Sequence, residues 1–308
     1  MRSFSNTLLS LAAALLIGNS AVGATPNGRA FPSADAAAKA LVNAAKSDDV
    51  AGLIAILGSS SKEILATSDA VADRQIRRAF VERAAAKIKL VADPKHPGAK
   101  TLLVGKDDWP LPIPIIRVKD KWYFDMEEGK DEILARRIGS NELDAIEVCR
   151  GYVEAQNNYA DDNRAGNIVY YAQKIMSSPG KRDGLYWTSS GNNDESPIGE
   201  FVSRAFAEGY TSRHEPYHGY FFKILTAQGL HASGGSMSYI RDGLMTRGFA
   251  LIAWPADYGV TGVMTFLVDK AGIVYQKDLG PKTAEMGRQY TRYDPDETWA
   301  PVANSASK

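Results

Sequence analysis

The chain has 308 residues, of which 44% are hydrophobic and 23% are charged, a composition typical of a globular protein with its own core. Lysine plus arginine and aspartate plus glutamate each number 36, so no excess of positive charge indicates a nucleic-acid-binding protein. After the first residues of the chain, no run approaches the roughly 18 apolar residues expected of a membrane-spanning helix.

The N-terminus has the features of a secretion signal. Arg2 supplies a positive charge, and the apolar run 8–17 that follows is too short to span a bilayer. Val22 and Ala24 lie at the −3 and −1 positions of a cleavage site. We therefore predict a signal peptide over residues 1–24 and a periplasmic location for the mature chain, with an uncleaved anchor helix as the alternative.

Residues 31–126 change from a helical to a strand pattern. Ser33 is a favourable N-cap, and apolar residues recur after it at helical spacing. The later segments alternate charged and apolar residues and are separated by turn residues. Helices followed by a strand meander predict an α+β domain over residues 25–128. The expected elements are two helices within 31–58, a helix at 73–86 and strands at 87–92, 101–104, 113–118 and 121–126.

An unusual loop, KDDWPLP, occupies residues 106–112. Asp107, Asp108 and Trp109 are followed by two prolines that stiffen the backbone. One interpretation is a recognition loop, which makes these three residues candidates for binding. We favour the other interpretation, a bulge on an edge strand, because loop acids and a tryptophan specify no chemistry by themselves.

The second half is predicted as a long helix on an antiparallel sheet. After a linker at 129–139, Ser140 or Asn141 caps a helix that runs to about Tyr159. Its apolar stripe is wide, so the helix should lie flat on a sheet. The domain is predicted at 140–299, followed by a disordered tail at 300–308. Its other expected elements are helical turns at 170–176, a helix at 198–208, strands at 220–225, 249–254, 264–268 and 273–277, and an exposed glycine-rich insert at 231–248.

Several long segments are similar to one bacterial family. They include DDWPLPIP, SPGKRDGLYW and EPYHGYFFKILTAQG, and the similarity extends roughly from Phe31 to Trp299. The chain resembles the uncharacterised secreted proteins of Gram-negative bacteria grouped as domain of unknown function 2950. This resemblance implies no assigned activity, so it supplies no catalytic residues.

Two architectural resemblances are more local. The helices and the KWYFD strand at 121–125 resemble small NTF2-like domains. The long helix, with Ala155, Gln156, Tyr159 and Ala160 near its end, resembles the globular head of type II secretion pseudopilins. The chain lacks the apolar first half of a pilin helix and the processing site before it, so filament assembly by the usual route is not implied. A shared fold does not carry a function with it.

His214, Glu215 and His218 match the HExxH pattern of zinc peptidases. That chemistry requires both histidines on one face of a helix, whereas Pro216 interrupts the motif and turn residues flank it. We therefore expect no metal and no cofactor. The alternative is that Tyr217 and His218 begin a strand, with His218 hydrogen-bonded to a neighbouring loop.

No other catalytic motif occurs in the sequence, and the single cysteine, Cys149, lies on a helix face typical of a buried, inert thiol. Charged and aromatic residues at turns and strand ends suggest a recognition surface, although tryptophans more often fill cores. The most favoured function is therefore non-catalytic recognition or assembly in the cell envelope, with an envelope protein or a small molecule as partner. A periplasmic hydrolase is the alternative. The candidate surface residues, beyond Tyr217 and His218, are Lys181, Arg182, Tyr186, Trp187, Trp254, Asp257, Tyr258 and Lys277.

Overall fold

The computed structural model describes residues 27–162, 164–188, 195–210 and 215–303. The predicted signal peptide, His214 and the last residues of the predicted tail lie outside these ranges. The fold is mixed α+β with open antiparallel sheets, as the sequence indicated at this coarse level. No helix within the described residues is both long enough and apolar enough to cross a bilayer.

Four helices and a five-stranded antiparallel sheet form the N-terminal part. Ser33 caps the first helix by accepting a hydrogen bond from the Ala36 N–H, as its sequence predicts. The helices pack on the sheet around a cluster that includes Leu41, Ile56 and Phe124. The sheet order is β1-β2-β4-β5, and β3 pairs with β2. The elements are α1 (Ala34–Lys46), α2 (Val50–Leu57), the 3-10 turn η1 (Ser59–Ser61), α3 (Lys62–Leu65), α4 (Ala70–Ala86), β1 (Ile88–Ala92), β2 (Lys100–Val104), β3 (Trp109–Pro110), β4 (Ile115–Val118) and β5 (Lys121–Phe124).

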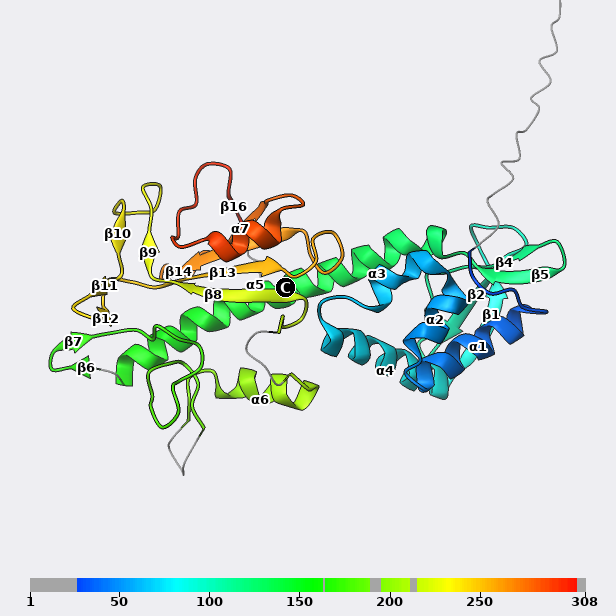
Figure 1. The fold of residues 1–308 in the computed structure, drawn as a ribbon, viewed down its shortest axis with the longest axis horizontal. Coiled ribbons are helices and arrows are strands. Elements are labelled where there is room, and N and C mark those ends of the chain that lie inside the picture. Colours follow the sequence, from blue (N-terminus) through cyan, green and yellow to red (C-terminus); the bar gives the residue numbers. More distant parts are fainter. Residues whose placement is uncertain (1–26, 163, 189–194, 211–214, 304–308) are drawn as a thin grey trace, which may run out of the picture.

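A single helix of 37 residues, α5 (Met126–Asp162), connects the two parts of the molecule (Figure 1). The predicted start at Ser140 or Asn141 is therefore wrong, and the predicted linker at 129–139 is helical. Gly129 lies near the start of this helix, although glycine has a low helix propensity. Tertiary packing explains it, because a Cβ there would lie 2.8 Å from the Cα of Ile113.

The second half is built on a five-stranded antiparallel sheet of order β16-β15-β14-β13-β8. Strand β13 is buried along its whole length and pairs with a strand on each side, β14 and β8. Helix α5 packs against β13 and β14, and α7 packs against β13. The elements are β6 (Arg164–Ala165), β7 (Ile168–Val169), α6 (Gly199–Glu208), β8 (Tyr220–Leu225), β9 (Ala227–Gln228), β10 (Met237–Ser238), β11 (Ile240–Arg241), β12 (Leu244–Met245), β13 (Ala250–Pro255), β14 (Met264–Asp269), β15 (Tyr275–Asp278), α7 (Thr283–Gln289) and β16 (Ala300–Pro301).

Two local predictions for this half are wrong, and a third holds only in part. Residues 170–176 are not helical, because the Tyr171 backbone pairs with Met245 and Met176 pairs with Tyr186. The insert at 231–248 is exposed over much of its length, as predicted, but it is anchored by Tyr239 and Met245, which are 2% and 0% exposed. Strand β16 forms within the predicted tail, because Ala300–Pro301 pairs with β15. In each case a hydrophobic or backbone contact with residues elsewhere in the chain sets a conformation that the segment's own sequence does not indicate.

Candidate functional site

The loop before α4 ties the two parts of the molecule together. Asp69 caps α4 by accepting a hydrogen bond from the Ala72 N–H at 2.9 Å. Its other carboxylate oxygen accepts hydrogen bonds from the Tyr210 hydroxyl at 3.0 Å and from the Gly219 N–H at 2.8 Å. Asp69 is only 2% exposed, so one buried carboxylate serves both a helix N-terminus and the residues that lead into β8.

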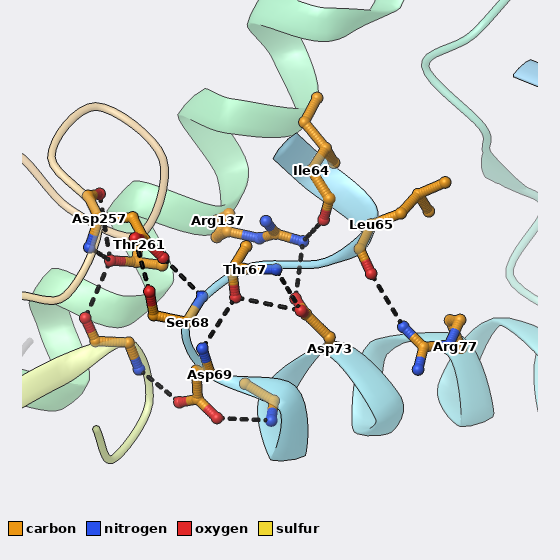
Figure 2. Close-up of polar contacts among 12 residues, drawn as sticks. Ile64, Leu65, Thr67, Ser68, Asp69, Asp73, Arg77, Arg137, Asp257 and Thr261 are labelled. Atoms are coloured by element: carbon orange, nitrogen blue, oxygen red, sulfur yellow. Dashed lines mark hydrogen bonds and ion pairs between the residues drawn. The ribbon is translucent and has the colours of Figure 1, made fainter. Parts of the chain in front are cut away.

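The neighbouring residue, Ser68, makes a second link of this kind. Its N–H and hydroxyl each donate to the Asp257 carboxylate at 2.7 Å. Thr261 holds the Asp257 loop by accepting from the Asp257 N–H and donating to the Gly219 carbonyl (Figure 2). Asp257, a predicted recognition residue, is therefore engaged inside the molecule.

Arg137 enters the same region from α5. Its Nη2 donates to the Ile64 carbonyl at 2.8 Å and lies 3.7 Å from an Asp73 oxygen (Figure 2). The Arg137 side chain is 8% exposed and that of Asp73 is 5% exposed. Burial raises the pKa of Asp73, although hydrogen bonds from Thr67 and the charge of Arg137 oppose this shift. Among the described residues, Arg137 Nη1 is buried and has no hydrogen-bond partner.

A cavity of about 600 Å³ lies beside Arg137. Helices α1, α2, α4 and α5 and the segment 109–113 contribute to its wall. It is partly open to solvent, and one wall residue, Ile76, is 51% exposed. Most of the wall is apolar, and its polar groups include Arg137, Asp144, Glu208 and His218. The main apolar wall residues are Leu41, Leu53, Phe80, Trp109, Ile113 and Ile133.

The imidazole of His218 lies between two carboxylates. Its Nδ1 is 2.7 Å from Asp144 on α5, and its Nε2 is 2.8 Å from Glu208 at the end of α6. The Tyr217 ring stacks on it with 4.2 Å between ring centroids. Burial disfavours the charged ring, but the hydrogen bonds to both carboxylates outweigh this and raise the pKa of His218. With a carboxylate at hydrogen-bond distance from each nitrogen, the arrangement favours the imidazolium form, which can donate from both nitrogens.

The backbone around His218 also shows whether the HExxH pattern has the helical form of a zinc-peptidase site. Residues 215–219 form a bend and a turn rather than a helix, so the helical face that a zinc peptidase requires is missing there. His214 lies outside the described residues. Within the described ranges, no group of three or more histidine, cysteine, aspartate or glutamate side chains is arranged to hold a metal ion. The Asp144 and Glu208 carboxylates contact opposite nitrogens of the His218 ring, so the ring lies between the two carboxylates and keeps them apart.

The predicted loop residues around Trp109 lie on the edge of the N-terminal sheet. Asp107 pairs with Arg83, and Asp108 pairs with Lys87. Trp109 belongs to β3, lines the cavity and is contacted by the Arg83 and Arg136 guanidinium groups. Within the described residues, β3 pairs with β2, which agrees with an edge position, while the predicted bulge stays a prediction. Trp109 itself lines the cavity of the candidate site.

The remaining predicted residues do not form one surface. Trp254 is 5% exposed and belongs to the core, where its ring packs near Phe221. Tyr258 donates to Asp278. Lys277 contacts Thr298 and the Trp299 ring. Tyr186 contacts the Phe206 ring, and Arg182 lies over the Trp187 ring. Lys181 is exposed at a turn.

Sequence reasoning missed several residues of this site, among them Asp69, Arg137, Asp144 and Glu208. A signal for Asp69 was present, since Ser-Asp directly precedes the helical run of α4 and is a typical N-cap pair. No such signal marks the other three, because a charged residue on a helix is usually solvated. Cys149 lies outside the site, and burial raises the pKa of its thiol to about 12, as expected for an inert side chain.

Fold and site together define a mixed α+β protein with a largely apolar cavity beside a cluster of buried polar groups. Residues 28–302 match the family described as "Protein of unknown function (DUF2950)", and the chain belongs to that family. This match confirms the resemblance predicted from the sequence motifs. No curated protein and no solved structure matches the chain, so the likeness to NTF2-like domains and pseudopilin heads stays a prediction.

Replacing His218 by glutamine should reduce stability most at pH 6 and less at pH 9. The pKa of His218 is raised in the folded state, so its contribution is complete below the unfolded pKa of about 6.5 and is lost as the pH rises through the folded pKa. Two hydrogen bonds to charged groups indicate a loss of about 1–3 kcal/mol at pH 6. Urea denaturation at both pH values measures this.

The matched control for this variant is His231→Gln, since His231 is more exposed and contacts a single carboxylate, Asp294. The control should change stability little at either pH. A loss for His218→Gln that is the same at pH 6 and pH 9 would contradict the assignment of a charged ring.

Proposed function

We propose that this protein binds a small, largely apolar ligand in the cavity beside Arg137, and that it acts by recognition rather than by catalysis. The cavity volume of about 600 Å³ carries the proposal. Small-molecule sites typically span roughly 300–1,000 Å³ and combine apolar walls with a few polar groups. The apolar wall around Phe80, Trp109 and Ile133 and the polar groups at Arg137 and His218 have this composition.

The state of the titratable groups supports a non-catalytic role. A general base needs an unprotonated atom within reach of the substrate. Both nitrogens of His218 face carboxylates, and the Cys149 thiol is buried with a raised pKa. Neither group is available as a base or a nucleophile in this arrangement.

A periplasmic hydrolase is the second candidate. The contact between Asp144 and His218 Nδ1 favours it, because a carboxylate orients the histidine in the same way in hydrolytic triads. A substrate would have to displace Glu208 from Nε2 before the ring could accept a proton. Hydrolysis of p-nitrophenyl esters by the wild-type chain, lost in His218→Gln, would favour this candidate over the first.

We also propose a periplasmic location and a two-domain architecture. The apolar run at 8–17 and the site after Ala24 support secretion to the periplasm, where the ligand or a partner would come from the cell envelope. Two separate hydrophobic clusters support a division into an NTF2-like domain and a pseudopilin-head-like domain. In this architecture the cavity belongs mainly to the first domain, and Glu208, Tyr210 and His218 of the second complete its wall.

Replacing Ile133 by tryptophan should weaken ligand binding about tenfold or more, because the indole would fill part of the cavity. The measurement is a fluorescence titration with N-phenyl-1-naphthylamine, an uncharged apolar dye that brightens in apolar sites. The wild-type chain should bind the dye saturably.

Leu143→Trp is the matched control, because Leu143 lies on the same helix and is 68% exposed. This variant should bind the dye like the wild-type chain. The proposed function is wrong if the wild-type chain shows no saturable binding, or if both variants bind the dye equally well.

A further inference from the structure

Strand β8 lies at one margin of the five-stranded sheet in the second half, with β13 on its inner side (Figure 1). The Gly219 carbonyl, just before β8, accepts a hydrogen bond from the Ala256 N–H, just after β13. Peptide groups alternate in direction along an antiparallel pair. The N–H and C=O groups of Phe221 and Lys223 therefore face β13, and those of the residues between them face away from the sheet.

The outward-facing peptide groups of β8 are those of Tyr220, Phe222 and Ile224. At one end, the Tyr220 N–H and C=O bond to the Tyr217 backbone, and beyond the other end the Thr226 carbonyl accepts a backbone N–H. Within the described residues, the N–H and C=O groups of Phe222 and Ile224 have no hydrogen-bond partner. Two donors and two acceptors thus lie between two closed ends, which is what an added strand pairs with.

An apolar groove lies against this edge. Its volume is about 1090 Å³, and Phe222 and Ile224, both only partly buried, line it. Tyr152 of α5 and Leu251, the cross-strand neighbour of Ile224, belong to the same wall. Helix α6 contributes further wall residues, among them Phe206, which is 49% exposed, and no residue of α6 is buried. Accessible apolar side chains therefore lie beside the unpaired backbone groups.

Lys223 brings an unbalanced positive charge to this edge. Its Nζ donates to the Arg288 and Tyr290 carbonyls at 2.9 and 2.6 Å, and neither acceptor carries a formal charge. In the part of the chain that the structure describes, no carboxylate forms an ion pair with the Lys223 ammonium. Lys223 lines the groove, and its contact with Arg288 is exposed. An acidic residue on a neighbouring strand, directly opposite Lys223, would balance this charge, since opposed Cβ atoms lie about 4.5–5.5 Å apart.

We infer that β8 pairs with an extended segment of a partner protein in which an acidic residue lies between two apolar residues. The apolar residues lie opposite Phe222 and Ile224 and exchange backbone hydrogen bonds with them. Their side chains lie on the same face as those of Phe222 and Ile224, toward the apolar wall. The acidic residue lies opposite Lys223. This site is separate from the cavity beside Arg137, so the inference goes beyond the proposed function.

The test is fluorescence polarisation with the labelled pentapeptide SVEVS, which has this pattern. The wild-type chain should bind it saturably. N-methylation of both valines removes the donors that face β8 and should weaken binding about tenfold or more. N-methylation of the glutamate is the matched control, because that donor faces away from β8, and it should weaken binding much less. No saturable binding, or equal losses for both methylated peptides, would overturn the inference.

Lys223→Met tests the acidic position. The wild-type chain should bind SVEVS about tenfold more tightly than SVKVS, and Lys223→Met should lose this preference. Lys270→Met is the control, because Lys270 is exposed at the turn after β14, and it should keep the preference. A preference that persists in Lys223→Met would contradict the pairing of charges.

Hydrogen exchange of the wild-type chain locates the site without a variant. The Phe222 and Ile224 amide protons should exchange rapidly in the free chain and slowly with SVEVS bound, whereas those of Phe221 and Lys223 should exchange slowly in both states. Protection of the first pair in the free chain that rises with protein concentration would assign the edge to a second copy and overturn the inference. Ile133→Trp should bind SVEVS like the wild-type chain, and a loss there would place the peptide in the other cavity.

Discussion

Replacing Trp254 by alanine should lower the free energy of unfolding by about 3–5 kcal/mol, the range for removing a large aromatic side chain from a core. Trp254 is 5% exposed on the central strand β13, and its ring lies 5.7 Å from that of Phe221 between centroids. A Cβ at Gly287 of α7 would lie 2.5 Å from the indole, which shows how closely the helix covers it. Guanidinium chloride denaturation of the wild-type chain and of Trp254→Ala measures the difference in their free energies of unfolding.

Trp187→Ala is the comparison for this prediction, because Trp187 was an equally strong recognition candidate and is only partly buried against the same core. It should lower stability by about 1–2 kcal/mol. Equal and small losses for both tryptophans would show that Trp254 is not a core residue.

Replacing Asp69 by alanine should lower the free energy of unfolding by about 3–5 kcal/mol. The change removes an N-cap, worth about 0.5–2 kcal/mol, and leaves the Tyr210 hydroxyl and the Gly219 N–H without their acceptor. Each hydrogen bond to a charged group contributes about 1.5–3 kcal/mol. The three bonds to Asp69 belong to one network, so their contributions do not simply add. Urea denaturation at neutral pH provides the measurement.

Asp49→Ala is the matched control, since Asp49 caps α2 through the Gly52 N–H and is exposed. It should cost about 1 kcal/mol, which is the value of a cap alone. If the two substitutions cost the same, Asp69 contributes only its cap, and the contacts to Tyr210 and Gly219 carry no stability.

Local patterns predicted the elements that depend on local physics. The N-cap at Ser33 and the apolar segment that became β13 were readable because capping and burial leave a mark within a few residues. The start of α5 was not readable, because Gly129 looks like a helix breaker until its contact with Ile113 is known. Propensity alone cannot show a glycine that is required by close packing.

The candidate site was less predictable than the fold. His218 was expected to hydrogen-bond a loop, but its partner Asp144 lies 74 positions away on a helix. Arg137 reads as one more charged residue on α5, and only the folded chain shows that its guanidinium is buried beside Asp73. Pairings of this kind depend on which elements meet in space, so single-residue patterns do not contain them.

The continuity of α5 has a consequence for how the molecule unfolds. Ile133 and Leu134 pack on the N-terminal cluster, and Ala145 and Ile146 belong to the second cluster. About three to four helical turns separate these pairs, a distance over which helix formation is cooperative. Fraying α5 at either cluster therefore removes hydrogen bonds that support the other. The two halves should melt in one transition, and amide protons midway along α5 should exchange with solvent as slowly as those of the sheets.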